Sequence, residues 1–197
     1  RLAEAIAAAP GLQVSGVAAR LPSLRELFAE AGVPDLLLVD LMLPPAHVKA
    51  LLNDLRHNTR QKRPLLLVLA VSADDPRVMQ ALCDGADGYF AQAQAPQSLP
   101  AALQQLLSGE STMTPQIARQ LKSHFEAMAR DGAAATRAPG LCDADWRLLQ
   151  WMAEGFLVTE VARGLQLSIH ELGVRIRDLY RALQCDMRAG SSTLSAA

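Results

Sequence analysis

Two uninterrupted aliphatic runs constrain the fold of this chain more than any other feature. They are residues 35–40 (DLLLVD) and residues 64–71 (PLLLVLAV). A strand with one face in water alternates apolar and polar residues, whereas these runs do not, so each indicates a strand buried on both faces. Such strands are typical of a parallel sheet that helices cover on both sides.

The segments around these runs alternate between helix and strand with short connections. The remaining elements that we predict are helices over 2–9, 24–31, 45–57, 75–84 and 96–109, and strands over 12–17 (LQVSGV) and 86–90. This rhythm predicts a doubly wound parallel sheet over residues 1–109. The chain begins inside a helix, so the strand that should precede it is absent. We therefore expect the protein to begin earlier, by roughly a strand and a loop.

The second half of the chain has a different pattern. A polar amphipathic helix over 114–130 and a Gly/Ala/Pro-containing stretch over 131–139 read together as a linker over 110–139. From residue 140 to 197 the pattern is helical, with helices over 143–154, 158–165 and 169–183, and a further turn or two over 191–197. A short helix, a tight turn with Ser168 as the N-cap, and a longer helix bearing arginines follow the helix-turn-helix plan.

Composition excludes several classes of function. The chain has 197 residues, and half of them are hydrophobic, which is typical of a globular protein. Its formal net charge is −1, so the molecule as a whole has no electrostatic preference for nucleic acid. The three cysteines and four histidines are scattered without metal-ligand spacing, which fits buried thiols in the cytoplasm. No apolar run is long enough to span a membrane. No catalytic triad, metal cluster or Gly-rich phosphate loop appears, so we do not expect an enzyme.

Specific motifs in both halves carry a resemblance to a known family. In the first half they are DLLLVDLMLP and GADGYF, followed by APQSLPAALQQLLSG; in the second half they are LLQWMAEGF, EVARGL, LS and RDLYRAL. Together they resemble the response regulators of the NarL/FixJ type. The resemblance implies an α/β receiver-like domain over 1–109, a linker over 110–139, and a four-helix LuxR-type helix-turn-helix domain over 140–197.

The resemblance assigns the receiver chemistry to three positions. Asp40 stands at the phosphoacceptor position, at the carboxyl end of a strand, where open parallel sheets place their ligand sites. An alternative is that Asp40 only caps the loop or the next helix. The hydroxyl that reports phosphorylation is replaced by Ala70, although Ser72 could substitute from the loop. The lysine that pairs with the phosphoryl group is replaced by Gln92.

Magnesium is implied only under one condition. Receivers hold Mg²⁺ with a pair of acidic residues after the first strand, and those residues would lie upstream of Arg1. Asp40 is a metal ligand only if that pair exists. With Ala70 and Gln92 in the switch positions, our hypothesis is a degenerate receiver that the usual aspartyl phosphorylation does not switch. It would serve as a constitutive dimer platform or respond to another signal.

The helix over 169–183 is the expected DNA-reading element. The resemblance places base-facing positions at Gly173, Val174 and Arg177, and the DNA-binding residues that we predict are Ser168, Val174, Arg175, Arg177 and Arg181. Two residues depart from the family pattern. Glu171 would repel phosphate, and Gly173 weakens a helix by about 0.5–1 kcal/mol relative to alanine. The alternative is a solvated arginine face on an ordinary helix.

The expected partners follow from this assignment. Residues 140–197 contain no lysine, and their acids slightly outnumber their arginines, so we expect weak binding of double-stranded DNA by a monomer and a homodimer for useful affinity. The resemblance points to the helix over 96–107 and the last helix as dimer faces. It also adds a sensor histidine kinase, or another signalling protein, as a candidate partner.

Two competing interpretations stay open. One is a receiver-like protein-interaction module whose output domain has lost strong DNA binding, which the neutral charge, Glu171 and Gly173 favour. The other is a small-molecule-sensing regulator, because a receiver without phosphorylation needs some other input. The retained Arg177 and Arg181 and the helix-turn-helix spacing favour a DNA-binding transcription regulator.

Overall fold

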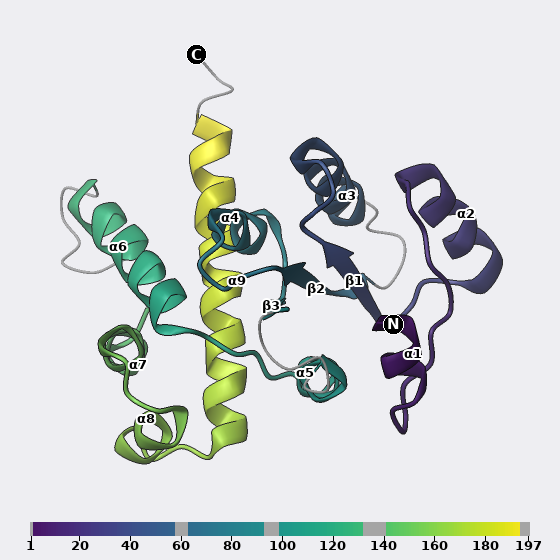
Figure 1. The fold of residues 1–197 in the computed structure, drawn as a ribbon. Helices are drawn as coiled ribbons and strands as arrows, with labels where there is room; N and C mark the ends of the chain where they lie inside the picture. The colour runs from purple at the N-terminus through teal and green to yellow at the C-terminus, as the bar shows by residue number, and fades with distance from the viewer. Residues whose placement is uncertain (1, 58–62, 93–98, 132–140, 194–197) are drawn as a thin grey trace. The chain divides into compact units, whose positions relative to one another are not determined.

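The computed structural model describes residues 2–57, 63–92, 99–131 and 141–193. The chain divides into two compact units, residues 1–108 and 109–197. The elements of the first unit are α1 (Leu2–Ala7), α2 (Leu21–Ala31), β1 (Leu36–Asp40), α3 (Pro45–His57), β2 (Leu65–Ala70), α4 (Pro76–Asp84), β3 (Gly88–Ala91) and α5 (Leu99–Leu107) (Figure 1).

The two aliphatic runs form neighbouring strands of a parallel sheet, which confirms the predicted fold class. Its order is β1-β2-β3, with Leu36 paired with Leu65 and Leu67 with Gly88. Leu66 and Val68 are fully buried on one face of β2, while Leu67 and Leu69 are buried on the other. Burial on both faces is the reason that neither run alternates with polar residues.

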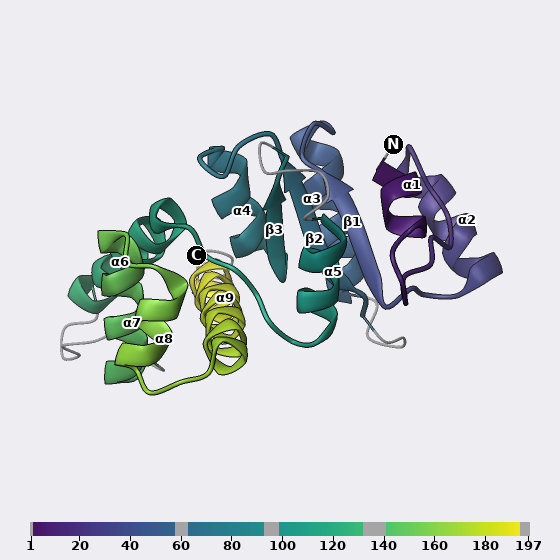
Figure 2. The same ribbon diagram turned by 60° about the horizontal axis from the view of Figure 1, so that its bottom comes forward.

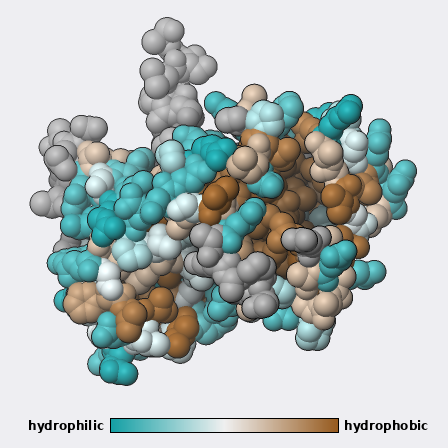
Figure 3. All heavy atoms as spheres, viewed as in Figure 1, coloured by the Kyte–Doolittle hydropathy of each residue, from teal (hydrophilic) through white to brown (hydrophobic). Residues whose placement is uncertain are grey.

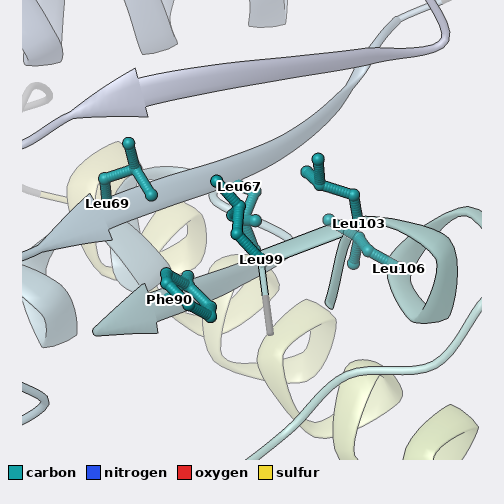
Figure 4. Packing of buried hydrophobic residues seen from close by; sticks show 6 residues of the cluster. All are labelled: Leu67, Leu69, Phe90, Leu99, Leu103 and Leu106. Carbon is teal, nitrogen blue, oxygen red and sulfur yellow. The ribbon is translucent and has the colours of Figure 1, made fainter. Parts of the chain in front are cut away.

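Helix α5 covers one face of the sheet. Its residues Leu99, Leu103 and Leu106 pack with strand residues Leu67, Leu69 and Phe90 in one buried cluster (Figure 4). Leu2 and Ile6 of α1 pack at the edge of the same cluster. Helix α4, which contacts α3, packs against β2 (Figure 2). The sheet is therefore sandwiched between helices, as its hydrophobic strands require.

One predicted strand is wrong. Residues 12–18 have no regular secondary structure, although LQVSGV alternates as a half-buried strand would. A strand is stabilised by hydrogen bonds to a neighbouring strand. In the part of the sheet that the structure describes, none pairs with this segment. Leu12 instead packs against the cluster under α5.

The second unit consists of helices α6 (Pro115–Asp131), α7 (Asp143–Glu154), α8 (Val158–Gly164) and α9 (Ile169–Thr193). Helix α6, which the sequence places in the linker, packs against α7. Its apolar stripe of Ile117, Leu121 and Phe125 is 0–1% exposed. The flexible part of the predicted linker falls largely on residues 132–140, which lie outside the described residues. The predicted domain boundaries therefore stay a prediction.

Helices α8 and α9 form the predicted helix-turn-helix. The turn between them uses Gln166 in the left-handed region, with φ of 59°. Leu172, Ile176 and Tyr180 line the buried face of α9. Helix α9 runs without a break to Thr193, whereas the sequence suggested an end at Leu183 and a separate turn near the terminus. No proline stands between Leu183 and Thr193 to stop the helix, and Gly190 only weakens it.

Candidate functional sites: the Asp40 edge and helix α9

Asp40 ends β1 at the carboxyl edge of the sheet, beside β2. It is paired in register with Leu69, and the backbone N–H of Leu41 continues the ladder to the Leu69 carbonyl at 2.9 Å. The Asp40 carboxylate accepts the backbone N–H of Met42 at 2.8 Å. Asp40 thus stands where a ligand site of a parallel sheet is expected, and it also caps its own loop. Both sequence interpretations of this residue are compatible with this geometry.

The two substituted switch positions lie at the same edge. Ala70 ends β2 and is 2% exposed, and its carbonyl accepts the backbone N–H of Gln92 at 2.7 Å. The Gln92 side chain is exposed. Ser72 lies in the loop after β2, where its hydroxyl accepts the backbone N–H of Asp74 at 3.2 Å. The fold brings the predicted positions to one edge, with the Ser72 hydroxyl bonded within its own loop.

Sequence reasoning missed one cation at this edge, Arg77 in the first turn of α4. Its guanidinium pairs with the Asp75 carboxylate at 2.6 Å and donates to the Leu41 carbonyl at 2.6 Å. The hydrogen bond from Arg77 lowers the pKa of Asp75, and the same hydrogen bond raises the pKa of Arg77, with a smaller contribution from the negative charge of Asp40. Arg77 therefore joins α4 to the loop after Asp40. An arginine outside the family motif could be found only from the three-dimensional arrangement.

No metal site can be assembled from the described residues. Among them, no group of three or more histidine, cysteine, aspartate or glutamate side chains is arranged to hold an ion. Asp75, the N-cap of α4, is bonded to Arg77. Magnesium stays a prediction that depends on the acidic pair upstream of Arg1. Likewise, none of the described helices is long and apolar enough to cross a membrane.

The start of α9 is closed by a reciprocal cap. The Ser168 hydroxyl accepts the backbone N–H of Glu171 at 3.1 Å, and the Glu171 carboxylate accepts the backbone N–H of Ser168 at 2.7 Å. This confirms Ser168 as the N-cap. The backbone hydrogen bond from Ser168, assisted by its hydroxyl, lowers the pKa of Glu171. Glu171 departs from the family pattern, but it has a structural role that the sequence interpretation did not recognise.

Arg175, predicted to bind DNA, is bonded to α7. Its Nε lies 2.7 Å from the Asp145 carboxylate, and its Nη2 lies 2.6 Å from Sγ of Cys142. Asp145 also accepts the backbone N–H of Cys142 and so caps α7. Burial by itself raises the pKa of Asp145, but the Cys142 N–H and Arg175 outweigh it, and the net pKa is lowered. Arg175 is thereby committed to holding α7 and α9 together.

The other predicted DNA-binding residues differ in exposure. Val174 is half-buried, and Arg177 is only 8% exposed. The side chain of Arg181 is 55% exposed and pairs loosely with Asp178 at 3.3 Å. Among these candidates, Arg181 is the arginine whose charge faces solvent. The assignment of all five residues to DNA stays a prediction.

No family model matches this chain. It is 29% identical over 187 residues to the nitrate/nitrite response regulator protein NarL of Escherichia coli, covering 93% of this chain and 82% of NarL. It is 28% identical over 185 residues to a glycerol metabolism activator of Pseudomonas putida, covering 91% of this chain and 80% of that protein. The chain is homologous to NarL, and it is consistent with a response regulator of the NarL/FixJ type.

Solved structures give a weaker likeness. A structure of two RcsB dimers bound to two parallel DNAs is 21% identical, with a TM-score of 0.48, over 92% of this chain and 87% of that one. The response regulator ChrA of a heme-sensing two-component system is 16% identical, with a TM-score of 0.41, over 98% of this chain and 90% of that one.

Proposed function

We propose that this homologue of NarL is a DNA-binding transcriptional response regulator that acts as a homodimer and is not switched by the usual aspartyl phosphorylation. The observation that supports the absence of a phosphorylation switch is the set of residues at the Asp40 edge. A carboxylate stands at the phosphoacceptor position, but the other two switch positions, at the ends of β2 and β3, hold Ala70 and Gln92. A phosphoryl group on Asp40 would lack both of its usual protein partners.

The missing partners matter energetically. A lysine bonded to a phosphoryl oxygen is a charge-assisted interaction of about 1.5–3 kcal/mol, and a neutral Gln92 cannot replace its charge. Ala70 has no hydroxyl to move toward the phosphoryl group, so no bond would couple phosphorylation to movement of the loop after β2. Arg77 carries a positive charge at this edge of the sheet, but its guanidinium is already bonded to the Asp75 carboxylate and to the Leu41 carbonyl.

Treatment of the full chain with a small phosphodonor tests this part. Intact-mass measurement should show no stable adduct beyond that of the Asp40→Asn control, and light scattering should show no change in dimerisation. An adduct near one per chain that Asp40→Asn abolishes, together with stronger dimerisation or DNA affinity, would contradict the proposal.

The DNA-binding part is supported by the α8-turn-α9 arrangement and by the exposed charge of Arg181. Binding of a mixed-sequence duplex by the full chain should be weak at low protein concentration and should strengthen as dimers form. The logarithm of the affinity should fall linearly with the logarithm of salt concentration. An affinity independent of both protein association and salt would argue against this function.

A protein-interaction module is the second candidate, and one surface favours it. Three consecutive apolar residues leading into α8 are exposed: Phe156 by 48%, Leu157 by 65% and Val158, the first residue of the helix, by 41%. In the view of Figure 3, hydrophobic residues are visible at the lower left, where Figure 1 places α8. A full chain that binds no duplex at any salt concentration, while Leu157→Asp reduces its self-association or partner binding, would favour this candidate.

A further inference from the structure

A group of apolar side chains is exposed where α7 leads into α8, within the second unit. Phe156, Leu157 and Val158 are consecutive, and Leu157 is the most exposed of them. The ring of the half-buried Trp151 lies against that of Phe156, with the ring centroids 6.4 Å apart. These four residues are called the α8 patch below. Hydrophobic residues are visible in this region in Figure 3.

The backbone around the α8 patch holds it in one conformation. Gly155 ends α7 in the left-handed region, with φ of 92°. The backbone N–H of Phe156 donates to the Trp151 carbonyl at 3.1 Å. A Cβ atom on Gly164 would lie only 2.5 Å from the Trp151 ring, so the glycine lets the indole pack directly on α8. Apolar side chains exposed on a preformed surface are typical of an interface.

The chemistry of this surface suits a protein better than DNA. Leu157 is the N-cap of α8 but makes no side-chain cap, and the Glu160 carboxylate accepts its backbone N–H at 2.8 Å. In a helix-turn-helix the first helix crosses the DNA backbone. Apolar side chains and a carboxylate offer a phosphate no charged donor, so this side of α8 calls for another occupant.

Charges on α8 favour a second copy of this chain as that occupant. Leu157, Glu160 and Arg163 are spaced three residues apart, so they share one side of the helix, and all three are exposed. A contact about a two-fold axis is reciprocal, so each residue and its counterpart meet twice. Two antiparallel α8 helices can therefore place each Glu160 opposite Arg163 of the other copy. This side of α8 is complementary to itself in charge.

The same register brings apolar surfaces together. With Glu160 opposite Arg163, Leu157 of each copy lies against the last turn of α8 in the other. That turn contains the exposed Gly164, on which the Trp151 indole packs. Leu157 thus meets an aromatic surface at each end of the contact, and the two ion pairs lie between them.

The area of the α8 patch agrees with a weak dimer. One aromatic side chain has about 200 Å² of surface, so the three partly exposed residues 156–158 present roughly 300 Å². A standard interface buries about 800 Å² on each partner, of which a little more than half is apolar. The patch supplies most of that apolar share. We expect a dissociation constant of about 1–100 μM.

We infer that the exposed side of α8 is a self-association surface, on which α8 of a second copy packs antiparallel about a two-fold axis. Leu157 is the apolar anchor at each end, and Glu160 pairs with Arg163 across the axis. The inference rests on the homodimer of the proposed function and adds to it a contact made by the second unit.

The anchor is tested by the dimer dissociation constant of the full chain, measured by sedimentation equilibrium. Leu157→Ser removes the apolar side chain and provides a better N-cap, so α8 should stay folded. We expect it to weaken the dimer by about 10- to 100-fold. Val17→Ser is the matched control, because Val17 is 79% exposed in the first unit. It should change the dissociation constant by less than about 2-fold.

The two-fold register is tested through the charges. Arg163→Glu would oppose Glu160 of the second copy and should weaken the dimer by about 3- to 10-fold, an effect that about 1 M salt should remove. Glu160→Gln keeps the cap on Leu157. It should weaken the wild-type dimer but strengthen the Arg163→Glu dimer, because there it removes a repulsion. Circular dichroism checks that the helix content is kept.

The contrary outcomes are distinguishable. A chain that is dimeric, with a dissociation constant that Leu157→Ser leaves unchanged, would overturn the inference. The proposed homodimer would then use another face, and the α8 patch would serve a different protein. A chain that stays monomeric up to about 1 mM would overturn both. Equal weakening by Val17→Ser would remove the role of Leu157 as anchor. If Glu160→Gln acted in the same direction in both backgrounds, the antiparallel register would be wrong.

Discussion

The Asp40 edge of the first unit and the arginine face of α9 in the second are the two places where the sequence predicts activity. At the Asp40 edge the position is retained, because the parallel register puts Asp40 beside the end of β2, but Ala70 and Gln92 cannot supply the partner chemistry. On α9 the arginines are retained, but Arg175 is bonded to Asp145 within the same unit. A motif position and a usable functional group are therefore separate properties.

The difference has a common physical cause. A side chain can serve a ligand only when its hydrogen-bonding groups are not already used by the protein. Arg77 and Arg175 are both cations near a predicted site, and both donate to carboxylates of their own unit. Among the predicted DNA-binding arginines, Arg181 differs because its partner, Asp178, is an exposed neighbour one turn away on the same helix.

The largest effect on stability should come from a substitution in α6, which tests whether this helix is a linker or a structural part of the second unit. Phe125→Ala removes a fully buried side chain that packs within the helical unit, and it should lower the free energy of unfolding by about 3–5 kcal/mol. Urea unfolding followed by tryptophan fluorescence measures it, since Trp146 and Trp151 both belong to α7. Ser123→Ala, on the exposed side of α6, is the control. A loss of less than about 1 kcal/mol in the free energy of unfolding would mean that α6 is a linker helix and not a structural part of the unit.

Arg175 and Arg181 should give opposite results. Arg175→Ala breaks the bonds to Asp145 and Cys142 and should cost about 1.5–3 kcal/mol of stability, with no change in the salt dependence of DNA affinity. Arg181→Ala should change stability by no more than about 0.5 kcal/mol, but should reduce the salt slope by about 1. Urea unfolding and duplex titrations at several salt concentrations measure both. If both variants changed the salt slope equally, the distinction between Arg175 as a structural residue and Arg181 as a DNA contact would be wrong.

Acid should weaken the second unit through Asp145. Its pKa is lowered in the folded state, so this carboxylate adds stability above its unfolded pKa of about 4, and that stability is lost as pH falls through the folded value. The free energy of unfolding should decrease from about pH 6 to about pH 3, and less steeply in Asp145→Asn. Chemical unfolding at a series of pH values tests this. An identical pH slope in Asp145→Asn would contradict it.

The smallest effect is expected at Arg77. Its pair with Asp75 is partly exposed, so Arg77→Ala should cost only about 0–1 kcal/mol of stability. Loss of the bond to the Leu41 carbonyl should nevertheless speed amide exchange in the loop after Asp40. Arg25→Ala, which removes an exposed pair with Asp54, is the matched control and should leave that loop unchanged. Equal exchange in both variants would mean that Arg77 does not hold the loop.

The sequence by itself was sufficient for the parallel strands and for the helix-turn-helix. Both follow from local patterns, because a strand buried on two faces must be continuously apolar and a cap needs a residue such as Ser168 at the right place. The same local logic wrongly predicted a strand over 12–17, since alternation cannot reveal whether a neighbouring strand is present to pair with it.

Tertiary structure decided which functional groups are engaged within the protein. Asp145 stands thirty residues before Arg175, and Glu110 stands sixty residues before His170, so no periodicity or motif connects them. Gly173 illustrates this most clearly. In the sequence it is only a weak point in a helix, whereas in the fold it is the notch against which Glu110 packs. Long-range contacts of this kind depend on how the helices pack, which a local sequence pattern does not contain.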